Sequence, residues 1–230
     1  MFSYYGAKTK IVHLYPPPKF GRVIEPFAGS ARYALRYFEK EVLLVDKFDR
    51  LIEVWLWLQK ASKADILGLP DQPANLDTIT WLSQAERDFC GFQWRPANQW
   101  PCNKVGSFRN KDAQYWRAIK KRISESLFKI RHWEIKCGDY TECPQVEATW
   151  FIDPPYQEGG KKYKWGSQRI DFVALRQWIE NRQGQRIVCE SIGADWMDFQ
   201  PLARVQGAKN TNYTEAIWTG DNRPIQAQLF

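Results

Sequence analysis

The chain of 230 residues is long enough for one catalytic domain, or for one domain that carries a modest insertion. A core of the size that such a chain can bury needs no disulfide or metal to hold it. Its 33 basic and 26 acidic residues give a formal net charge of +7, and twelve residues are tryptophan. A basic, aromatic-rich chain suits a polyanionic partner on whose bases it can stack, although many basic proteins bind no nucleic acid.

The sequence also argues against several other classes of protein. The N-terminus lacks the basic and apolar regions of a secretion signal, and no apolar run approaches the roughly 20 residues that span a bilayer. The five cysteines contain no C-x-x-C pair, and only two histidines accompany them. Reduced thiols fit this pattern better than a disulfide framework or a zinc site. We therefore expect a cytoplasmic protein with no membrane and no metal partner.

The first sixty residues alternate between predicted strands and helices. A short strand over 22–25 leads into the small-residue turn Ala28-Gly29-Ser30, and a helix is predicted over 31–39. Residues 41–46 form a continuous apolar run with an acid at its end, as expected for a strand that is buried on both faces. A helix over 50–60 follows. This order predicts the opening of an α/β doubly wound sheet.

The pattern changes after residue 60. Between 61 and 101, Pro, Asn, Asp, Gln and Trp are interspersed, so that no alternating strand pattern persists. Residues 104–111 are polar and basic. An amphipathic helix is then predicted over 112–131. Its core-facing positions are Trp116, Ile119, Ile123, Leu127 and Ile130. The basic residues expected mostly elsewhere on its surface are Arg117, Lys120, Lys121 and Lys129.

Strand patterns resume in the last hundred residues. Strands are predicted over 133–137, 148–152, 186–190 and 212–219, with a helix over 172–181. The α/β pattern therefore stops near residue 57 and returns near 132. We expect one α/β domain built from 1–56 and 132–230, interrupted by a mostly helical insertion over 57–131.

The turn after the first predicted strand has the features of a ligand site. Its small residues would let the backbone approach a ligand, and the following helix N-terminus would offer N–H groups. Asp46 ends the second strand, where an open parallel sheet presents a carboxylate to ribose hydroxyls. No G-x-G-x-x-G pattern, and so no diphosphate cradle, is present. The turn suits a nucleoside without a diphosphate, such as S-adenosylmethionine, although a plain strand–helix turn fits equally well.

Asp153-Pro154-Pro155-Tyr156 follows a predicted buried strand and gives a sharper indication. The two prolines hold the backbone extended and would direct the Asp153 carboxylate and the Pro154 carbonyl towards one point. Two such acceptors can bind both protons of an exocyclic amino group and draw its lone pair out of ring conjugation. The nitrogen can then attack a sulfonium methyl group, while Tyr156 stacks on the base. If the tetrapeptide stood alone, a turn with a tyrosine on the surface would be the simpler interpretation.

Taken in order, these motifs resemble the Dam-type adenine-N6 DNA methyltransferases of the α group, over most of the chain outside the insertion. The resemblance implies a Rossmann-like methyltransferase sheet and S-adenosylmethionine as cofactor. It implies that the cofactor is bound by Tyr5, Gly6, Ala7, Lys8, Glu25, Pro26, Phe27, Ala28, Gly29, Ser30, Asp46, Asp139 and Tyr140. It gives the catalytic role to Asp153, Pro154, Pro155 and Tyr156.

Within that family an N-terminal motif, which Tyr4-Tyr5-Gly6-Ala7-Lys8 resembles, lies against the methionine part of the cofactor. The acid that Asp46 matches accepts hydrogen bonds from the ribose. The acid at Asp139 contacts the adenine amino group. Asn212-Tyr213-Thr214-Glu215 resembles a late strand that helps to line the target-base pocket. Two positions depart from the pattern: Ala7 replaces a second glycine, and Gly29-Ser30-Ala31 has fewer glycines than many relatives. Both are exchanges of one small residue for another, which bear on cofactor affinity rather than on the assignment.

The insertion stands where this family carries its target-recognition region. Residues 87–136 contain twelve basic and four acidic residues, a net of +8, which accounts for the excess charge of the whole chain. DNA binding would then depend strongly on salt. The expected DNA contacts are Arg95, Lys104, Arg109, Asn110, Lys111, Lys161, Lys162 and Tyr163. Trp94 and Trp100 could stack on bases, but burial is the commoner fate of a tryptophan.

The last three of these contacts belong to a basic loop over 158–165, which we expect to be mobile. It could close over a flipped nucleotide, grip a phosphate, or be a plain solvated loop. We therefore predict a site-specific adenine-N6 DNA methyltransferase that acts on double-stranded DNA in a bacterial cell or a phage-infected host, with a monomer favoured. Cytosine-N4 methylation, RNA or protein as the acceptor, and a non-catalytic DNA-binding relative remain as alternatives.

Overall fold

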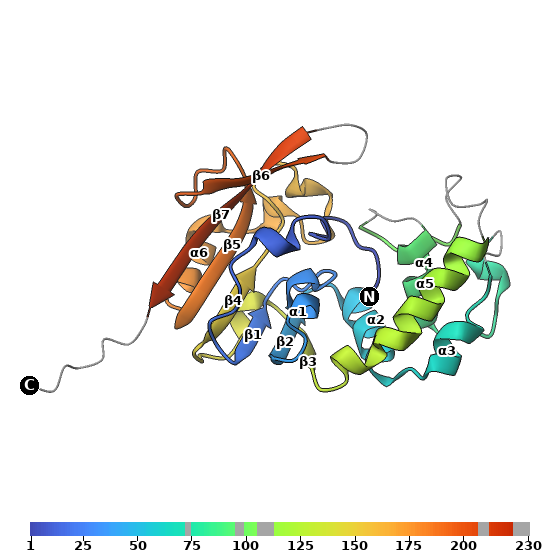
Figure 1. Cartoon of the computed structure of the whole chain (residues 1–230). Helices are drawn as coiled ribbons and strands as arrows, with labels where there is room; N and C mark the ends of the chain where they lie inside the picture. The colour runs from blue at the N-terminus through green and yellow to red at the C-terminus, as the bar shows by residue number, and fades with distance from the viewer. Residues whose placement is uncertain (72–74, 95–98, 105–112, 207–211, 223–230) are drawn as a thin grey trace, which may run out of the picture.

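A computed structural model describes the chain except for residues 72–74, 95–98, 105–112, 207–211 and 223–230 (Figure 1). The described strands form one sheet in the order β3-β2-β1-β4-β5-β7-β6. Their bounds, in that order, are Glu134–Cys137, Glu41–Asp46, Arg22–Glu25, Ala148–Ile152, Gly184–Ser191, Asn212–Asn222 and Gln200–Gln206. Strands β1 to β5 run parallel, and β7 runs antiparallel to both of its neighbours. The α/β class predicted from the sequence is confirmed, in a form compatible with a Rossmann-like fold.

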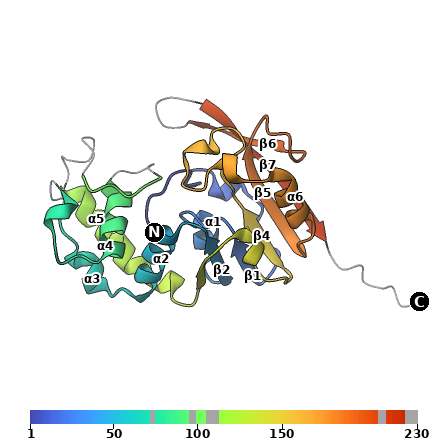
Figure 2. The same cartoon turned by 180° about the vertical axis from the view of Figure 1, so that it is seen from behind.

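Helices cover both faces of the sheet, as the two views in Figures 1 and 2 show. Helices α1 (Arg32–Arg36) and α2 (Asp49–Lys60) lie on one face, and α6 (Phe172–Glu180) lies on the other. Each strand packs against both helix layers because successive side chains point to opposite faces of the sheet. Leu44 packs into the cluster beneath α2, and its neighbour Leu43 packs into the cluster beneath α6. Burial on both faces explains why residues 41–46 read as a continuous apolar run.

The chain reverses its direction of winding between β1 and β4, which lie side by side at the centre of the sheet. Strand β2 lies on one side of β1, whereas β4 and β5 extend the sheet on the other. In open α/β sheets, ligands bind outside the carboxyl ends of the strands at such a switch point. The first turn follows β1 and Asp153 follows β4. The topology therefore brings the two predicted motifs to one place.

In the residues that the structure describes, the insertion is helical. It contains α3 (Lys63–Gly68), α4 (Gln84–Trp94) and α5 (Ala113–Ser126), of which α4 packs on α2 and α3 packs on α5. Arg50 of α2 donates to the buried Asp88 of α4 at 2.7 Å. Short 3₁₀ turns complete the described structure: η1 (Val12–Leu14), η2 (Leu76–Thr78), η3 (Leu127–Ile130), η4 (Tyr140–Glu142), η5 (Gly160–Lys162) and η6 (Ser167–Arg169).

The insertion and the sheet share one hydrophobic core. The ring of Phe2 lies between α2 and α4, with its centroid 5.0 Å from that of Trp55 and 5.9 Å from that of Phe92. Trp116 of α5 joins the same cluster, and all of these side chains are buried. The predicted boundary at residue 57 falls inside α2, so the insertion continues a helix that already packs on the sheet.

Several element boundaries differ from the predictions. The helix predicted over 31–39 spans only Arg32–Arg36, because Ala31 takes a left-handed conformation (φ +47°) and Tyr37 leaves helical geometry (φ −120°). The helix predicted over 112–131 ends at Ser126 and continues as the 3₁₀ turn η3. Strand β6 was not predicted, because it is a half-exposed edge strand that contains a proline.

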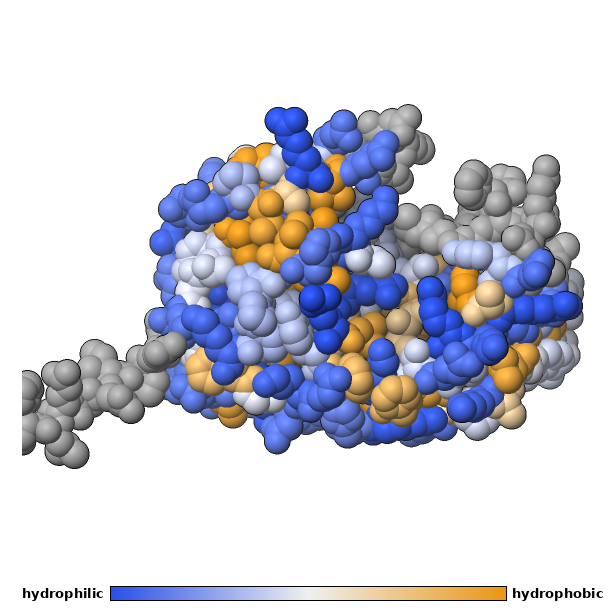
Figure 3. Space-filling view, viewed as in Figure 1, coloured by the Kyte–Doolittle hydropathy of each residue, from blue (hydrophilic) through white to orange (hydrophobic). Residues whose placement is uncertain are grey.

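The two ends of the molecule differ in surface character. On the face seen in Figure 3, apolar side chains gather over the end of the sheet formed by β6 and β7, and hydrophilic ones cover most of the insertion. In the part of the chain that the structure describes, every helix is too short or too polar to span a bilayer.

Lys120 corrects the expectation that it lies on the surface of its helix. Only 4% of the residue is exposed, and its ammonium group donates to the carbonyls of Leu67 (3.1 Å) and Leu69 (2.6 Å) and to Asp71 (2.8 Å). Leu67 and Leu69 lie at the C-terminal end of α3, where a helix leaves carbonyls without partners and a cation is favoured. Lys120 therefore ties α5 to α3.

We predict that Lys120→Ala lowers the free energy of unfolding by about 2 kcal/mol, because it leaves buried carbonyl oxygens without a donor. Lys121→Ala, at the exposed neighbouring position, should change it by no more than about 0.5 kcal/mol. Urea unfolding of both variants measures the difference. Equal stability of the two variants would show that the three contacts of Lys120 contribute nothing.

Candidate functional site

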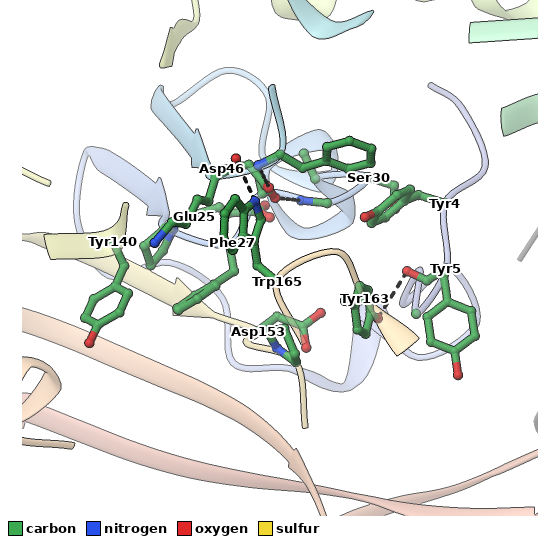
Figure 4. Close-up of a pocket in the computed structure, with 18 of the residues that line it drawn as sticks. Tyr4, Tyr5, Glu25, Phe27, Ser30, Asp46, Tyr140, Asp153, Tyr163 and Trp165 are labelled. Atoms are coloured by element: carbon green, nitrogen blue, oxygen red, sulfur yellow. Dashed lines mark hydrogen bonds between the residues drawn. The ribbon is translucent and has the colours of Figure 1, made fainter. Parts of the chain in front are cut away.

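A cavity of about 450 Å³ opens at the carboxyl ends of the central strands (Figure 4). Its volume lies in the range of small-molecule and cofactor sites. Its walls come from segments that are far apart in sequence: 4–8, 25–32, 46–48, 138–140, 163–165 and 169–171, together with Phe151, Asp153 and Pro155. Of the residues predicted to bind the cofactor, all thirteen lie on these walls. Of the tetrapeptide, Asp153 and Pro155 line the cavity, whereas Pro154 and Tyr156 do not.

The turn after β1 is fixed by its own hydrogen bonds. Ala28 donates its N–H to Val45 O at 3.0 Å, and Gly29 donates to the Asp46 carboxylate at 3.0 Å. The indole of Trp55 donates to Gly29 O at 3.0 Å. Gly29 and Ala31 both have positive φ, and for alanine this costs about 1–2 kcal/mol. The N–H groups of Ala28 and Gly29 are used within the fold, and α1 has five residues, so the turn does not form a diphosphate cradle.

Glu25 is almost fully buried at the end of β1. Its carboxylate accepts the N–H of Ala34 at 2.6 Å, so it takes one of the N–H groups that the sequence suggested for a ligand. Burial raises the pKa of Glu25 to about 8, an effect that Asp153 reinforces and the Ala34 N–H opposes. Near neutral pH this side chain is therefore mostly protonated.

Asp46 and Asp139 are held in different ways. Asp46 accepts one backbone N–H at each oxygen, from Gly29 at 3.0 Å and from Phe48 at 2.9 Å, while its burial raises its pKa. Each carboxylate oxygen has a second lone pair that a ligand hydroxyl can use. Asp139 caps η4, and hydrogen bonds from Lys47 and Thr141 outweigh its partial burial and lower its pKa.

Aromatic rings form the apolar part of the cavity wall near Asp139. The rings of Phe27 and Tyr140 stack with their centroids 5.5 Å apart and an angle of 29° between their planes. Figure 4 shows both rings at the same end of the cavity. Carboxylates with spare lone pairs beside flat apolar surfaces can hold a hydroxylated, heteroaromatic ligand. Among the described residues no group of three or more His, Cys, Asp or Glu side chains could hold a metal ion.

Lys8 joins the N-terminal segment to the tetrapeptide. Its ammonium group lies 2.9 Å from Asp153 Oδ1, 3.7 Å from Glu215 Oε1 and 4.6 Å from the ring centroid of Tyr156. Burial disfavours this charge, but Asp153 and Glu215 outweigh burial and raise the pKa of Lys8 well above its usual value. Lys8 was predicted to contact the cofactor alone, and the structure also places it against the tetrapeptide.

Tyr156 is fixed by a hydrogen bond from its hydroxyl to Glu215 Oε1. Burial, and the nearby charges of Asp153 and Glu215, raise the pKa of Tyr156, so its hydroxyl is a donor at neutral pH. Glu215 itself is fully buried on β7, whereas its neighbour Tyr213 is 38% exposed. The late strand singled out in the sequence therefore lies directly behind the tetrapeptide.

The segment after the tetrapeptide packs across the cavity. The Tyr163 hydroxyl donates to Tyr5 O at 3.4 Å, Lys164 Nζ lies 2.7 Å from Asp49, and the Trp165 indole donates to Lys47 O at 3.1 Å. Tyr163, predicted as a DNA contact, lines the cavity (Figure 4). Lys161 and Lys162 are exposed.

Several lining residues were not predicted from the sequence: Arg32, Lys47, Phe48, Phe151, Lys164, Trp165, Arg169, Ile170 and Asp171. Lys47 and Phe48 directly follow Asp46, so their position after a parallel strand was a usable signal. Asp171 accepts two N–H groups at the start of α6, the sequence signature of a helix cap. Lys164, Trp165, Arg169 and Ile170 depend on how the segment after the tetrapeptide folds, which shows no regular periodicity.

The residues expected to contact DNA from the insertion are only partly described. Arg95, Arg109, Asn110 and Lys111 lie outside the described residues, and Lys104 is exposed. Trp94 is buried. Trp100 is 44% exposed, and its ring centroid lies 5.2 Å from that of Phe48, a lining residue of the cavity.

The positive charge of the insertion is partly used within the fold. Lys120 and Arg117 both pair with Asp71. Arg87 donates to the carbonyl of Leu76 at 2.7 Å. The positive charge available to an external polyanion is therefore smaller than the net charge of residues 87–136.

Gly6 is required at its position by the Tyr163 hydroxyl. Its φ is +73°, and a Cβ built there would collide with that hydroxyl. We expect Gly6→Ala to lower the free energy of unfolding by about 2 kcal/mol through backbone strain and overpacking. Tyr163→Phe in the same chain should recover about 1 kcal/mol of this, because only the hydroxyl collides. A double-mutant cycle by urea unfolding measures the coupling, and strictly additive effects would contradict the assigned clash.

Glu25 should make stability depend on pH. Its pKa is about 8 in the folded chain against an ordinary value of 4.5, so between these values the folded state keeps a proton that the unfolded chain has lost. The stability contributed by the protonated form is therefore lost as the pH rises through this window. Glu25→Gln, which mimics the protonated form, should gain stability relative to the wild type from about pH 5 to about pH 8 and no further above it.

Unfolding free energies measured across that range test this prediction. Glu39→Gln, the same exchange at an exposed position, is the matched control. A difference between the wild type and Glu25→Gln that stays constant with pH would contradict the raised pKa.

Comparison with known proteins adds little to this geometry. No family model matches the chain, and no curated protein matches it. The chain is similar to a solved structure described as a conserved hypothetical protein of Streptococcus pyogenes, with 11% identity, 88% of each chain covered and a TM-score of 0.32. That TM-score is too low to support a conclusion about fold or function.

Proposed function

We propose that the protein transfers a methyl group from S-adenosylmethionine to the N6 amino group of adenine in double-stranded DNA, after the target base has been flipped out of the duplex. One observation carries the proposal. A single cavity brings Asp46, Asp139 and the turn after β1 together with Asp153, although these residues span more than half of the chain. The first three suit a nucleoside, and the last is the residue through which the amino group would be bound.

The described residues fit the proposed cofactor. Asp46 has spare lone pairs for two ribose hydroxyls, and the lowered pKa of Asp139 keeps an ionised acceptor for the adenine amino group. Phe27 and Tyr140 offer apolar surface for the adenine ring. The turn after β1 lacks a diphosphate cradle, which suits a cofactor without a diphosphate. When bound, S-adenosylmethionine supplies a methyl group made electrophilic by the positive sulfur.

The tetrapeptide would bind and orient the target amine. The Asp153 carboxylate and the Pro154 carbonyl accept its two N–H groups and draw its lone pair out of conjugation with the ring. The ammonium group of Lys8 lies 2.9 Å from the Asp153 carboxylate and holds it in place. Tyr156, fixed by Glu215, offers its ring to the base. Positioning and electrostatics lower the barrier, and the amine needs no strong base because methylation makes it acidic.

The proposed DNA substrate rests on access and charge. An amino group paired inside a duplex cannot reach a methyl donor, so the base must leave the stack. Lys161 and Lys162 are exposed on the segment that crosses the cavity, where they can meet a phosphate backbone. The net charge of +7 makes the binding of a polyanion favourable and sensitive to salt.

We predict that Asp153→Ala lowers methyl transfer to DNA by about 100- to 1,000-fold while cofactor binding persists, because the acceptor for the amine is lost. Lys8 keeps Glu215 as a counter-ion in this variant, so the site is not left with an unpaired buried cation. Asp198→Ala removes an exposed acid outside the cavity and is the matched control. Transfer of labelled methyl groups and calorimetric titration of the cofactor measure the two properties.

The same assay separates the proposal from its alternatives. Duplex DNA, RNA and protein are offered as acceptors, and the modified nucleoside is identified by mass spectrometry. N4-methylcytosine as the product would overturn adenine as the target. Cofactor binding without transfer to any acceptor would point to a non-catalytic relative. Undiminished transfer by Asp153→Ala would overturn the proposed role of the tetrapeptide.

A further inference from the structure

Glu215 is a carboxylate buried in the interior of the sheet. It lies on β7, opposite Ser191 of β5 and Ala203 of β6, and none of its side chain is exposed. Burying a carboxylate costs several kcal/mol unless hydrogen bonds and a counter-charge compensate for it. Alanine or valine would fill an interior position of a strand without that cost of burying a charge. The acid therefore calls for an explanation in terms of the groups it contacts.

Among the described residues, the hydrogen bonds and the ion pair of Glu215 converge on one of its two oxygens. Oε1 accepts a hydrogen bond from the Tyr15 hydroxyl at 2.7 Å and another from the Tyr156 hydroxyl, and it lies 3.7 Å from Lys8 Nζ. Oε2 is buried and has no hydrogen-bond partner among the described residues. The carboxylate thus orients two phenol groups and an ammonium group through Oε1, while Oε2 accepts no hydrogen bond from the described residues.

A second buried acid nearby shows the contrasting arrangement. Glu190 of β5 is also fully buried, but both of its oxygens have partners. Its Oε1 accepts the N–H of Ser191 at 2.8 Å, and its Oε2 accepts from the N–H of Gln157 at 2.9 Å and from the Trp196 indole at 3.0 Å. Glu190 is satisfied by the fold around it. Glu215 is satisfied only in part, and two of its three partners, Tyr156 and Lys8, belong to the tetrapeptide or contact it.

Two of the three groups that Glu215 contacts, Tyr156 and Lys8, lie beside the proposed chemistry. Tyr156 is the last residue of the tetrapeptide, and its ring lies 4.6 Å from Lys8 Nζ. Lys8 in turn lies 2.9 Å from Asp153. A shift of Oε1 would therefore move the ring on which a base is proposed to stack, together with the cation that holds the acceptor of its amino group.

We propose that Glu215 is the positioning residue of the target-base pocket, whose buried carboxylate fixes the ring of Tyr156 and shares Lys8 with Asp153. This inference rests on the proposed methyltransferase function and deepens it. Glu215 touches neither the cofactor cavity nor the reacting atoms. It acts on the rate of transfer through Tyr156 and Lys8.

The test compares four variants of the full chain: Glu215→Gln, Tyr156→Phe, their combination, and Tyr15→Phe. Both tyrosine variants remove one hydrogen bond to the same oxygen, Glu215 Oε1, so they perturb the buried acid in the same way. Only Tyr156→Phe releases a ring of the tetrapeptide. Single-turnover rates of methyl transfer to duplex DNA are measured beside the dissociation constants of S-adenosylmethionine and DNA, with urea unfolding to establish that each variant folds.

We expect Glu215→Gln and Tyr156→Phe each to lower the single-turnover rate by about 10- to 100-fold, because a small misplacement of a reacting group has an effect of this size. The combined variant should fall no further than the slower single variant, since both changes act on one interaction. Tyr15→Phe should stay within about 3-fold of the wild type, and both dissociation constants should change by less than about 3-fold in all four variants.

The possible outcomes separate this inference from the function on which it rests. A wild-type chain that transfers no methyl group to any acceptor overturns both. An active wild type with an equally fast Glu215→Gln variant overturns the role of Glu215 alone, as do multiplicative rate losses in the combined variant. Equal losses in Tyr15→Phe and Tyr156→Phe would make Glu215 a structural acid. If Glu215→Gln does not fold, Tyr156→Phe against Tyr15→Phe still decides the question.

Discussion

The buried ammonium group of Lys8 links three parts of the chain at one point beside the cavity. It lies 2.9 Å from Asp153 after β4 and 3.7 Å from Glu215 on β7, and it comes from the N-terminal segment that forms one wall of the cavity. Two carboxylates this close to one cation would repel each other in its absence. Two other buried acids on the cavity wall have no such counter-ion. Glu25 keeps a proton, and Asp46 is stabilised by hydrogen bonds from backbone N–H groups.

Much of the sheet could be predicted from the sequence because burial on two faces leaves a distinct pattern. Strands β1, β2 and β4 were predicted at the bounds that the structure has. Helix α1 was predicted too long, because the left-handed conformation of Ala31 and the break at Tyr37 depend on tertiary packing rather than on local propensity. Strand β6 is an edge strand with a proline and half-exposed side chains, so it lacks the apolar pattern on which the prediction of the other strands relied.

The strand pattern made the cavity predictable only where its residues follow parallel strands, and Tyr5 to Lys8 were predicted from the family resemblance. Asp46 ends a strand, Asp139 and Asp153 come soon after one, and the carboxyl ends of parallel strands meet at one edge. The hydrogen bond between Tyr15 and Glu215 joins residues that are 200 positions apart, and no periodicity in a single sequence encodes such a contact. Tyr163 looked like part of a basic surface loop, and only the folded chain shows its hydroxyl against Tyr5.

The aromatic cluster around Phe2 has a consequence for how the chain unfolds. Phe2, Trp55 and Phe92 belong to the N-terminal segment, to α2 and to the insertion, and they pack in one continuous core with the sheet. A unit that opens without exposing the core of its neighbour can melt independently, whereas a shared core makes separate melting costly. The insertion and the sheet are therefore one cooperative unit, and loosening the first two residues of the chain weakens both at once.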